Sequence, residues 1–229
     1  MEAAFAVVGV CLSNSLYFST LPKMRTVFSE KSLNNFNPMP IIVMALNATA
    51  WVWYGLHVPD YAIVYGNAPG ALLCAWYIFN LFPLIEDPAD RRICQIVLWA
   101  GVIMIMGIQV CLRVLDIEKG AALQLEGLVA TGYCVAMFAA PLSKIRQVIV
   151  SKDASSIYWP LTTVQVVNCL TWTVYGFVQD DVWLYGPNTA GLILGLVQVA
   201  LLAIFGGCRR SSSLLPMEVG SPDGGRVTI

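Results

Sequence analysis

Charge is what this sequence has little of. Only 12% of its 229 residues are Asp, Glu, Lys or Arg, whereas soluble domains carry about a quarter. The apolar share is 58%, and the few charges fall in short clusters between apolar stretches of about the 20 residues that a membrane-spanning helix needs. Soluble enzymes and nucleic-acid-binding proteins are therefore excluded, and we expect a membrane protein.

Reactive and metal-binding side chains are scarce too. There is one histidine, and the seven cysteines never form a Cys-x-x-Cys pair, so we expect no metal site, no cofactor and no disulfide framework. The cysteines are interpreted as small packing residues. A formal net charge of −1 provides no basic surface for nucleic acid.

Seven apolar stretches predict seven transmembrane helices. The runs are continuous, whereas the strands of a closed β-barrel alternate. The first run follows Met1-Glu2 without basic residues, so we interpret it as a retained span and not as a signal peptide. The predicted spans are about 3–21, 40–57, 61–85, 93–112, 123–142, 157–178 and 182–206.

The distribution of Lys and Arg predicts the orientation. Eleven of the 13 basic residues lie after the first, third and fifth spans and in the tail, and only Arg113 and Lys119 lie in the opposite loops. Because basic loops stay cytoplasmic, we expect a multi-pass protein with its N-terminus outside and its C-terminus in the cytosol. The tail is rich in Ser, Gly and Pro and is predicted to be disordered.

An internal repeat is the strongest pattern in the chain. Shifted by 121 residues, the sequence matches itself at seven of the 24 positions from 47 to 70, where chance gives about one or two. The identical pairs are Asn47/Asn168, Trp51/Trp172, Tyr54/Tyr175, Gly55/Gly176, Asp60/Asp181, Asn67/Asn188 and Gly70/Gly191. Each unit has three helices and one helix lies between the units, so both units cross the membrane in the same direction.

We therefore predict an all-α membrane protein of seven transmembrane helices, built as two parallel three-helix repeats joined by a linker helix. The predicted divisions are a first repeat at 1–90, the linker helix at 91–117, a second repeat at 118–207 and a cytosolic disordered tail at 208–229. Parallel repeats with a site at their interface are typical of transporters. The architecture alone thus indicates a carrier.

The same residues resemble the SWEET sugar transporters, also called the MtN3/saliva family, of the eukaryotic seven-helix type. The resemblance covers about residues 9–206 and rests on paired Asn-x-x-x-Trp-x-x-Tyr-Gly segments at 47–55 and 168–176, on Gly66-Asn67-x-x-Gly70 and Pro187-Asn188-x-x-Gly191, and on Ala140-Pro141-Leu142-Ser143. It implies a facilitative carrier, a uniporter that moves sugar down its gradient by alternating access without ATP or an obligatory ion.

Two residue pairs are the candidates for sugar binding. A sugar presents hydroxyls and apolar ring faces, so its site needs amides that donate and accept and aromatic planes that stack. Asn67 and Asn188 supply the amides, and Trp51 and Trp172 supply the planes, which the resemblance places over the sugar on the extracellular side. Their bulk favours a monosaccharide such as glucose over sucrose. The expected partners are the sugar and membrane lipid, and the sequence leaves a homo-oligomer open.

The resemblance also implies hinge residues. Pro40, Pro141 and Pro160 match family prolines near the cytosolic ends of the units, where a missing N–H weakens a helix. The fourth family position is Thr20 in this chain. Either Pro22 replaces that hinge or the first helix bends less.

A gate is expected at the outer mouth. The candidates are Tyr54, Tyr175 and Asp181, with Asp60 more simply interpreted as a solvated loop acid. The loop after the second helix has no basic residue, so a hydrogen-bonded gate is expected in place of a salt bridge. His57 is interpreted as a bystander beside this mouth, and Glu126 as a peripheral or packing residue.

Three other classes of protein fit less well. An amino-acid or cystine carrier of the PQ-loop type would show Pro-Gln dipeptides and an intramembrane Asp, whereas this chain has Pro141-Leu142. A seven-helix receptor does not account for the repeat and the short loops. An intramembrane enzyme needs a catalytic constellation within the spans, and none is visible, so we expect no catalytic residues. The plasma membrane is the family default, with vacuolar and Golgi membranes as alternatives.

Overall fold

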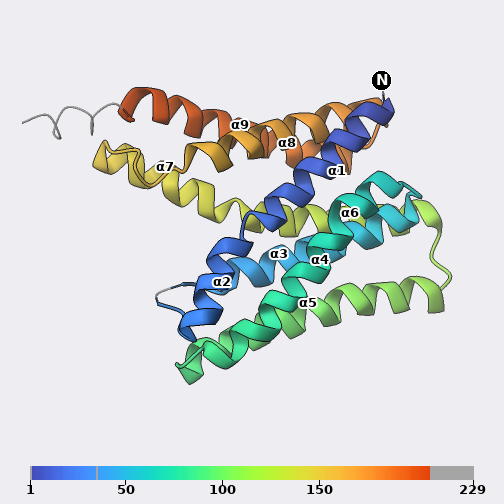
Figure 1. The fold of residues 1–229 in the computed structure, drawn as a ribbon. Coiled ribbons are helices and arrows are strands. Elements are labelled where there is room, and N and C mark those ends of the chain that lie inside the picture. The colour runs from blue at the N-terminus through green and yellow to red at the C-terminus, as the bar shows by residue number, and fades with distance from the viewer. Residues whose placement is uncertain (1, 35, 207–229) are drawn as a thin grey trace, which may run out of the picture.

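The computed structural model describes residues 2–34 and 36–206. Every regular element within these residues is a helix (Figure 1). The elements are α1 (Glu2–Phe18), α2 (Leu21–Glu30), α3 (Met39–His57), α4 (Tyr61–Leu81), the 3₁₀ helix η1 (Phe82–Leu84), α5 (Pro88–Val114), α6 (Lys119–Met137), α7 (Ala139–Ser151), α8 (Trp159–Val178) and α9 (Val182–Phe205). The tail predicted at 208–229 lies outside the described residues.

Two of the predicted spans are each divided into two helices. α1 and α2 make up the first span, and α6 and α7 the fifth. In each case the first helix ends four residues before a proline: α1 ends at Phe18 before Pro22, and α6 ends at Met137 before Pro141. Because proline has no N–H to donate to the carbonyl four residues earlier, the helix breaks there. The first and fifth spans thus remain single membrane crossings, each with a break beside a proline that was predicted as a candidate hinge.

The linker helix begins earlier than predicted. α5 starts at Pro88 because Asp87 caps it, its Oδ1 accepting the N–H of Ala89 at 2.8 Å, and proline is favoured at a first helical position. The helix then runs unbroken to Val114. Its first residues therefore fall inside the range predicted for the first repeat.

The surface and length of the helices are those of a multi-pass integral membrane protein. Six segments among the described residues are long and apolar enough to cross a membrane. The seventh, α8, is 20 residues long but more polar, with Thr162, Thr163, Gln165, Asn168, Thr171 and Thr173. Large apolar side chains are exposed on the outside of the bundle, as a lipid-facing surface requires; examples are Leu72, Phe79, Ile103 and Val150.

The helices form two three-helix units, with the linker helix packed along one side of them. α4 packs against both α1 and α3, and α9 packs against α8, α6 and α7, so the third segment of each unit lies between the other two. The linker α5 packs against α3 and α6. The units meet along two interfaces, α1 with α8 and α3 with α6. This arrangement confirms the predicted fold of two parallel repeats joined by a linker helix.

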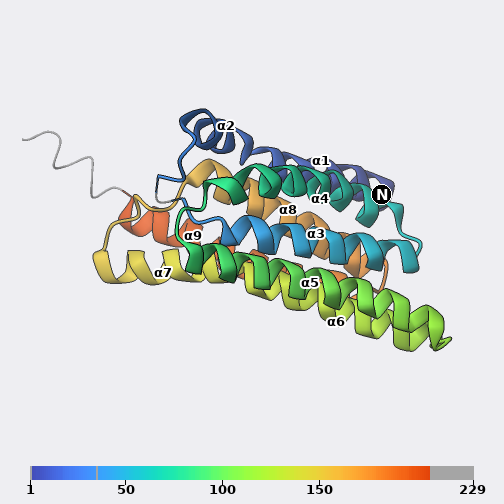
Figure 2. The same cartoon turned by 90° about the horizontal axis from the view of Figure 1, so that it is seen from below.

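The two ends of the bundle differ in the residues that they hold. The aspartate end contains the α3–α4 and α8–α9 turns, with Asp60 and Asp181. The proline end contains Pro22, Pro40, Pro141 and Pro160. Figures 1 and 2 show α2 and α7 together at this proline end and the start of α1 at the opposite end.

Candidate functional site

Two hydrogen bonds join the units at the aspartate end. Tyr54 of the first unit donates its hydroxyl to Asp181 Oδ1 of the second at 2.8 Å. Tyr175 of the second unit donates to Asp60 Oδ2 of the first at 2.9 Å. The two bonds are related by the repeat, so each unit gives one tyrosine and one aspartate. Asp60, interpreted from the sequence as a solvated acid, thus has the same role in the structure as Asp181.

The local fold holds both aspartates in place. Asp60 is the N-cap of α4 and accepts the N–H groups of Ala62 at 2.8 Å and Ile63 at 3.3 Å. Asp181 is the N-cap of α9 and accepts the N–H of Leu184 at 3.1 Å. A carboxylate that accepts at a helix start is aligned by the helix and stabilised by its dipole. Each aspartate therefore presents its tyrosine-binding oxygen in a fixed direction.

Burial changes the chemistry of one of these carboxyls. It raises the pKa of Asp181, while the hydrogen bonds from Tyr54 and from the α9 backbone act in the opposite direction. Burial disfavours a charge, and donors stabilise it. The Tyr54 hydroxyl is thus one of the donors that offset the effect of burial on the pKa of Asp181.

Each tryptophan contacts the tyrosine that follows it by three residues. Trp51 meets Tyr54 edge to face with ring centroids 5.5 Å apart, and Trp172 meets Tyr175 at 5.7 Å. Both tryptophans are buried, with 5% and 4% of their surface exposed. A spacing of three residues on one helix places such rings one turn apart on the same face. The two tyrosines and the two tryptophans therefore form two successive layers of aromatic rings at the aspartate end.

The indole of Trp172 is fixed across the α1–α8 interface. Its Nε1 donates to Ser13 Oγ at 2.8 Å, and Ser13 Oγ donates to Asn168 Oδ1 at 3.0 Å. Its ring packs on α1 and α4, since a Cβ added at Gly9 or Gly66 would lie 3.0 Å from it. Trp172 is thus held rigidly by both neighbours.

The other interface has no matching chain of hydrogen bonds. The repeat places Cys134 opposite Ser13 and Asn47 opposite Asn168. Asn47 Oδ1 is buried without a hydrogen-bond partner among the described residues. A thiol is a weak donor, and the position that corresponds to Ser13 carries one, so Asn47 Oδ1 lacks the hydroxyl that Asn168 Oδ1 accepts.

The two candidate asparagines lie at matching places but have different partners. Asn67 Nδ2 donates to the Ile63 carbonyl at 2.9 Å, and Asn188 Nδ2 donates to the Leu184 carbonyl at 2.8 Å. Asn67 Oδ1 also accepts the hydroxyl of Tyr17 at 3.0 Å.

Phe138 is the residue that the repeat places opposite Tyr17, and it has no hydroxyl. Within the described residues Asn188 Oδ1 has no hydrogen-bond partner, and the side chain is only partly buried. The amide oxygen that remains available is therefore that of Asn188.

Aromatic rings occupy the space beside the two repeat-related glycines. A Cβ at Gly70 would collide with the ring of Tyr17, and one at Gly191 would lie 3.0 Å from Cys169 Sγ and 3.4 Å from the ring of Phe138. The space beside each glycine is thus filled by an aromatic side chain, Tyr17 beside Gly70 and Phe138 beside Gly191.

The candidate hinge prolines fall into two kinds. Pro40 and Pro160 are each the second residue of a helix, α3 and α8, where the missing N–H has no partner to lose. Pro22 and Pro141 follow the breaks in the first and fifth spans. At the first span the break lies at residues 19–20, so Thr20 lies within it and Pro22 follows as the second residue of α2.

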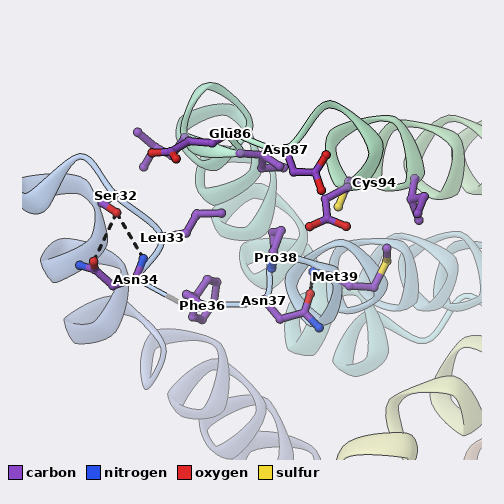
Figure 3. A pocket seen from close by; sticks show the side chains of 14 residues that line it. Ser32, Leu33, Asn34, Phe36, Asn37, Pro38, Met39, Glu86, Asp87 and Cys94 are labelled. Carbon is purple, nitrogen blue, oxygen red and sulfur yellow. Dashed lines mark hydrogen bonds between the residues drawn. The ribbon is translucent and has the colours of Figure 1, made fainter.

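A cavity of about 590 Å³ lies at the proline end (Figure 3). It separates the α2–α3 connection from the start of α5, and its labelled polar side chains include Asn34, Asn37 and Asp87. None of the candidate sugar-binding residues lines it. The described residues contain no cluster of His, Cys, Asp or Glu able to hold a metal ion.

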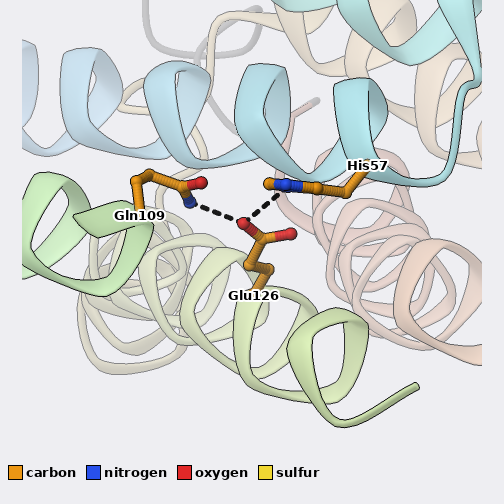
Figure 4. A network of polar contacts seen from close by, with 3 residues as sticks. All are labelled: His57, Gln109 and Glu126. Atoms are coloured by element: carbon orange, nitrogen blue, oxygen red, sulfur yellow. Dashed lines mark hydrogen bonds and ion pairs between the residues drawn. The ribbon is translucent and has the colours of Figure 1, made fainter. Parts of the chain in front are cut away.

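The sequence interpretation missed a polar contact between His57 and Glu126. His57 Nδ1 lies 2.8 Å from Glu126 Oε1, which also accepts a hydrogen bond from Gln109 Nε2 at 2.5 Å (Figure 4). His57 therefore contacts a buried acid of the second unit, a partner that the sequence interpretation did not give it. No repeat signal could have revealed this contact, because the offset places Val178 opposite His57 and Phe5 opposite Glu126.

Parallel units, a linker helix and paired residues at the unit interface define a membrane carrier. A family model described as "Sugar efflux transporter for intercellular exchange" matches residues 3–85 and 124–210, which is well over half of the chain. The chain belongs to this family, the MtN3/saliva or SWEET transporters. The family consists of transporters, which confirms the prediction that the chain is not an enzyme.

Similar proteins span plants, vertebrates and amoebae. The chain is 27% identical over 217 residues to the bidirectional sugar transporter SWEET11 of Arabidopsis thaliana, covering 94% of this chain and 74% of the relative. It is 27% identical over 208 residues to the sugar transporter SWEET1 of Xenopus laevis (90% and 94%), and 26% identical over 192 residues to SWEET1 of Dictyostelium discoideum (83% and 87%). A solved eukaryotic SWEET transporter has the same fold, with a TM-score of 0.81 at 24% identity over 90% of this chain and 97% of that one.

Proposed function

We propose that this chain is a facilitative sugar carrier, a uniporter that moves a monosaccharide such as glucose by alternating access. The observation that carries the proposal is the pair of reciprocal Tyr–Asp bonds across the two units, Tyr54 with Asp181 and Tyr175 with Asp60. Family membership and the names of the relatives support sugar as the cargo.

The two bonds act as the gate at the aspartate end. Both cross from one unit to the other, so a rocking motion that separates the units there breaks both together. A neutral donor to a carboxylate is worth a few kcal/mol at most, and water replaces it on opening, so such a gate opens and closes without a large energy change. In the closed arrangement Trp51 and Trp172 are buried and cover the bound sugar from the aspartate end.

The sugar binds between the two asparagines on α4 and α9. Asn188 Oδ1, which has no partner among the described residues, accepts a sugar hydroxyl. Asn67 and the hydroxyl of Tyr17 form the opposite wall. Trp51 and Trp172 provide aromatic faces for the apolar side of the ring.

The hinges lie at the proline end. The breaks before Pro22 and Pro141 allow α2 and α7 to move relative to α1 and α6, and Pro40 and Pro160 begin the helices that follow. On this proposal the units at 1–90 and 118–207 move against each other, with the linker helix at 91–117 between them.

We place the aspartate end outside and the proline end in the cytosol. The excess of Lys and Arg in the loops of the proline end supports this orientation, and the plasma membrane is the proposed location. The chain has no Pro-Gln dipeptide, so an amino-acid carrier is the weaker alternative.

The test is glucose flux through the full chain in proteoliposomes, with and without an uncoupler. We expect bidirectional flux that the uncoupler does not change. Asn188→Ala should abolish it, while Asn80→Ala, which removes an amide bonded to its own helix at Trp76, should not. Uncoupler-sensitive flux would reject uniport, and flux of amino acids without sugars would reject the substrate class.

A further inference from the structure

α2 and α7 carry matching basic residues at the proline end. Both helices follow a break in a span, and the offset of 121 pairs Lys23 with Lys144 and Arg25 with Arg146. None of these four side chains belongs to the gate or to the proposed sugar site. The two helices therefore share a pattern of charge that neither gating nor sugar binding requires.

The other exposed positions of the two helices differ between the repeats. Thr26, Ser29 and Glu30 are exposed on α2, and the offset places glutamine, valine and serine opposite them on α7. Identity is otherwise limited to a valine buried in each unit, Val27 and Val148, and to the lysine at the C-cap of each helix. Packing accounts for the valine, so the exposed charges need another reason.

The four charges have no counter-ion in the part of the chain that the structure describes. None of these side chains makes a hydrogen bond or an ion pair there. Lys23, Arg25 and Arg146 are exposed, and Lys144 is partly buried. The one acid on α2, Glu30, accepts a hydrogen bond from the α2–α3 connection, and α7 has no acid. The four charges are therefore available to a partner.

The basic pairs lie at the depth of the lipid headgroups. The segments Glu2–Glu30 and Lys119–Ser151 have 29 and 33 residues, which at the rise of an α-helix amounts to about 44 and about 50 Å. A hydrocarbon core is only about 30 Å thick, so both segments continue into the headgroup layer. In each one the basic residues come shortly after the predicted apolar run, which ends at 21 or 142.

The charges lie on both sides of each helix. Residues two apart on a helix differ by about 200° around its axis, and the residue between the basic pair of α2, Met24, is 0% exposed. Lysine and arginine therefore flank the buried face. On α7 the exposed Leu142 and Ile149 lie beside the pair, as is typical of a helix at a membrane surface. Long basic side chains at this depth reach phosphate groups on either side.

We propose that these two basic pairs bind the phosphate headgroups of anionic lipids in the leaflet at the proline end, and that the bound lipid eases closing of that end. When the proline end closes, α2 and α7 approach each other and bring like charges together. Anionic headgroups neutralise these charges and reduce the repulsion. The effect on closing rests on the proposed function, whereas the binding does not.

The first test measures lipid binding to the full chain in detergent by native mass spectrometry. We expect phosphatidylserine to be retained at least about fivefold more than phosphatidylcholine. The double variant Lys23→Gln with Arg25→Gln should lose about half of this preference, and so should Lys144→Gln with Arg146→Gln. The chain with all four changes should retain the two lipids equally.

The matched control is the double variant Arg113→Gln with Lys119→Gln. It removes two exposed charges at the aspartate end, so the native preference should be kept. An unchanged preference in the chain with all four changes overturns the lipid sites. A loss in the control as large as in the α2 and α7 variants also overturns them, because the effect would then follow from net charge alone.

The second test is glucose efflux from proteoliposomes of phosphatidylcholine, with and without about 30% phosphatidylserine. We expect phosphatidylserine to raise the rates of the native chain and of the control variant about threefold. The rate of the chain with all four changes should be the same in both membranes. A native rate that ignores the lipid, or a native rise in that variant, overturns the effect on closing. If no chain moves glucose, the proposed function fails, and the binding measurement still decides the lipid sites.

Discussion

The two units are nearly identical at the Tyr–Asp pairs of the aspartate end and differ about two turns further along α4 and α9. At the aspartate end each unit contributes one tyrosine and one capped aspartate, with bond lengths of 2.8 and 2.9 Å. At the level of the asparagines, the Tyr17 hydroxyl of the first unit donates to Asn67, while Phe138, the counterpart of Tyr17, has no hydroxyl and packs beside Gly191, three residues after Asn188. On the proposed function, the two Tyr–Asp bonds have to break together, which favours identical residues in both units. A sugar has no twofold symmetry, so the residues of the two units at the proposed sugar site can differ.

The largest expected effect separates the two asparagines. Asn188→Ala removes the amide with an available oxygen, and we expect glucose flux to fall by at least about 100-fold. Asn67→Ala removes an amide already held by Tyr17 and Ile63, and we expect a loss of about tenfold. Initial uptake, normalised to surface protein, measures both. Equal losses would mean that the two amides serve the sugar alike.

Exchanging the aromatic partners should give the next largest effect. Phe138→Tyr adds a hydroxyl near Asn188 that competes with the sugar, so we expect the half-saturating glucose concentration to rise about tenfold. Tyr17→Phe frees Asn67 Oδ1 and should change that concentration by no more than about threefold. The concentration dependence of uptake distinguishes the two, and a larger effect of Tyr17→Phe would reverse the assignment.

The gate variants should have equal effects. Tyr54→Phe and Tyr175→Phe each remove one of the two bonds, so each should speed labelling of Cys134 by a membrane-impermeant thiol reagent about threefold. The measurement uses a chain in which the other cysteines are replaced by alanine. Tyr61→Phe, an exposed tyrosine that stacks on Tyr65 near the same mouth, is the control. Unequal rates for the two gate variants would show that the gate is not symmetric.

The smallest effect concerns the buried amides on α3 and α8. Ser13→Ala removes the hydroxyl that links Trp172 to Asn168 and should lower the free energy of unfolding by about 1–2 kcal/mol. Cys134→Ser offers Asn47 a donor and should raise the free energy of unfolding by about 1 kcal/mol. The shift of thermal unfolding in detergent, a few degrees at most, measures each. Loss of stability in both variants would argue against a missing bond at Asn47.

Much of the fold could be predicted from the sequence. Uncharged runs of membrane length gave the spans, and the 121-residue offset gave the two units and their common direction. The breaks in the first and fifth spans were not predicted as breaks, although Pro22 and Pro141 were singled out. A proline cannot donate a hydrogen bond to the carbonyl four residues before it, so a helix tends to end at that earlier residue. This rule predicts the break once a proline is known to lie inside a span.

The site could be predicted only where the repeat is exact. Tyr54, Tyr175 and the asparagines were visible as identical pairs, whereas Tyr17, Ser13 and Glu126 lie opposite Phe138, Cys134 and Phe5. Comparing the two repeats for identical residues misses such positions, because the residues at them differ. The differences between repeats, when compared position by position, would have pointed to Tyr17 and Ser13. The cluster around Glu126 also needs Gln109 of the linker helix, which has no repeat partner.

The positions of the two helix breaks have a mechanical consequence. The offset of 121 places Phe18 opposite Ala139, so α1 ends two residues later in its unit than α6, which ends at Met137. Two residues along an α-helix amount to about 3 Å of rise and more than half a turn of rotation. On the proposed function, α2 and α7, the helices that follow the breaks, therefore turn at different depths in the membrane and about differently directed axes. The passage between them then widens more on one side than on the other.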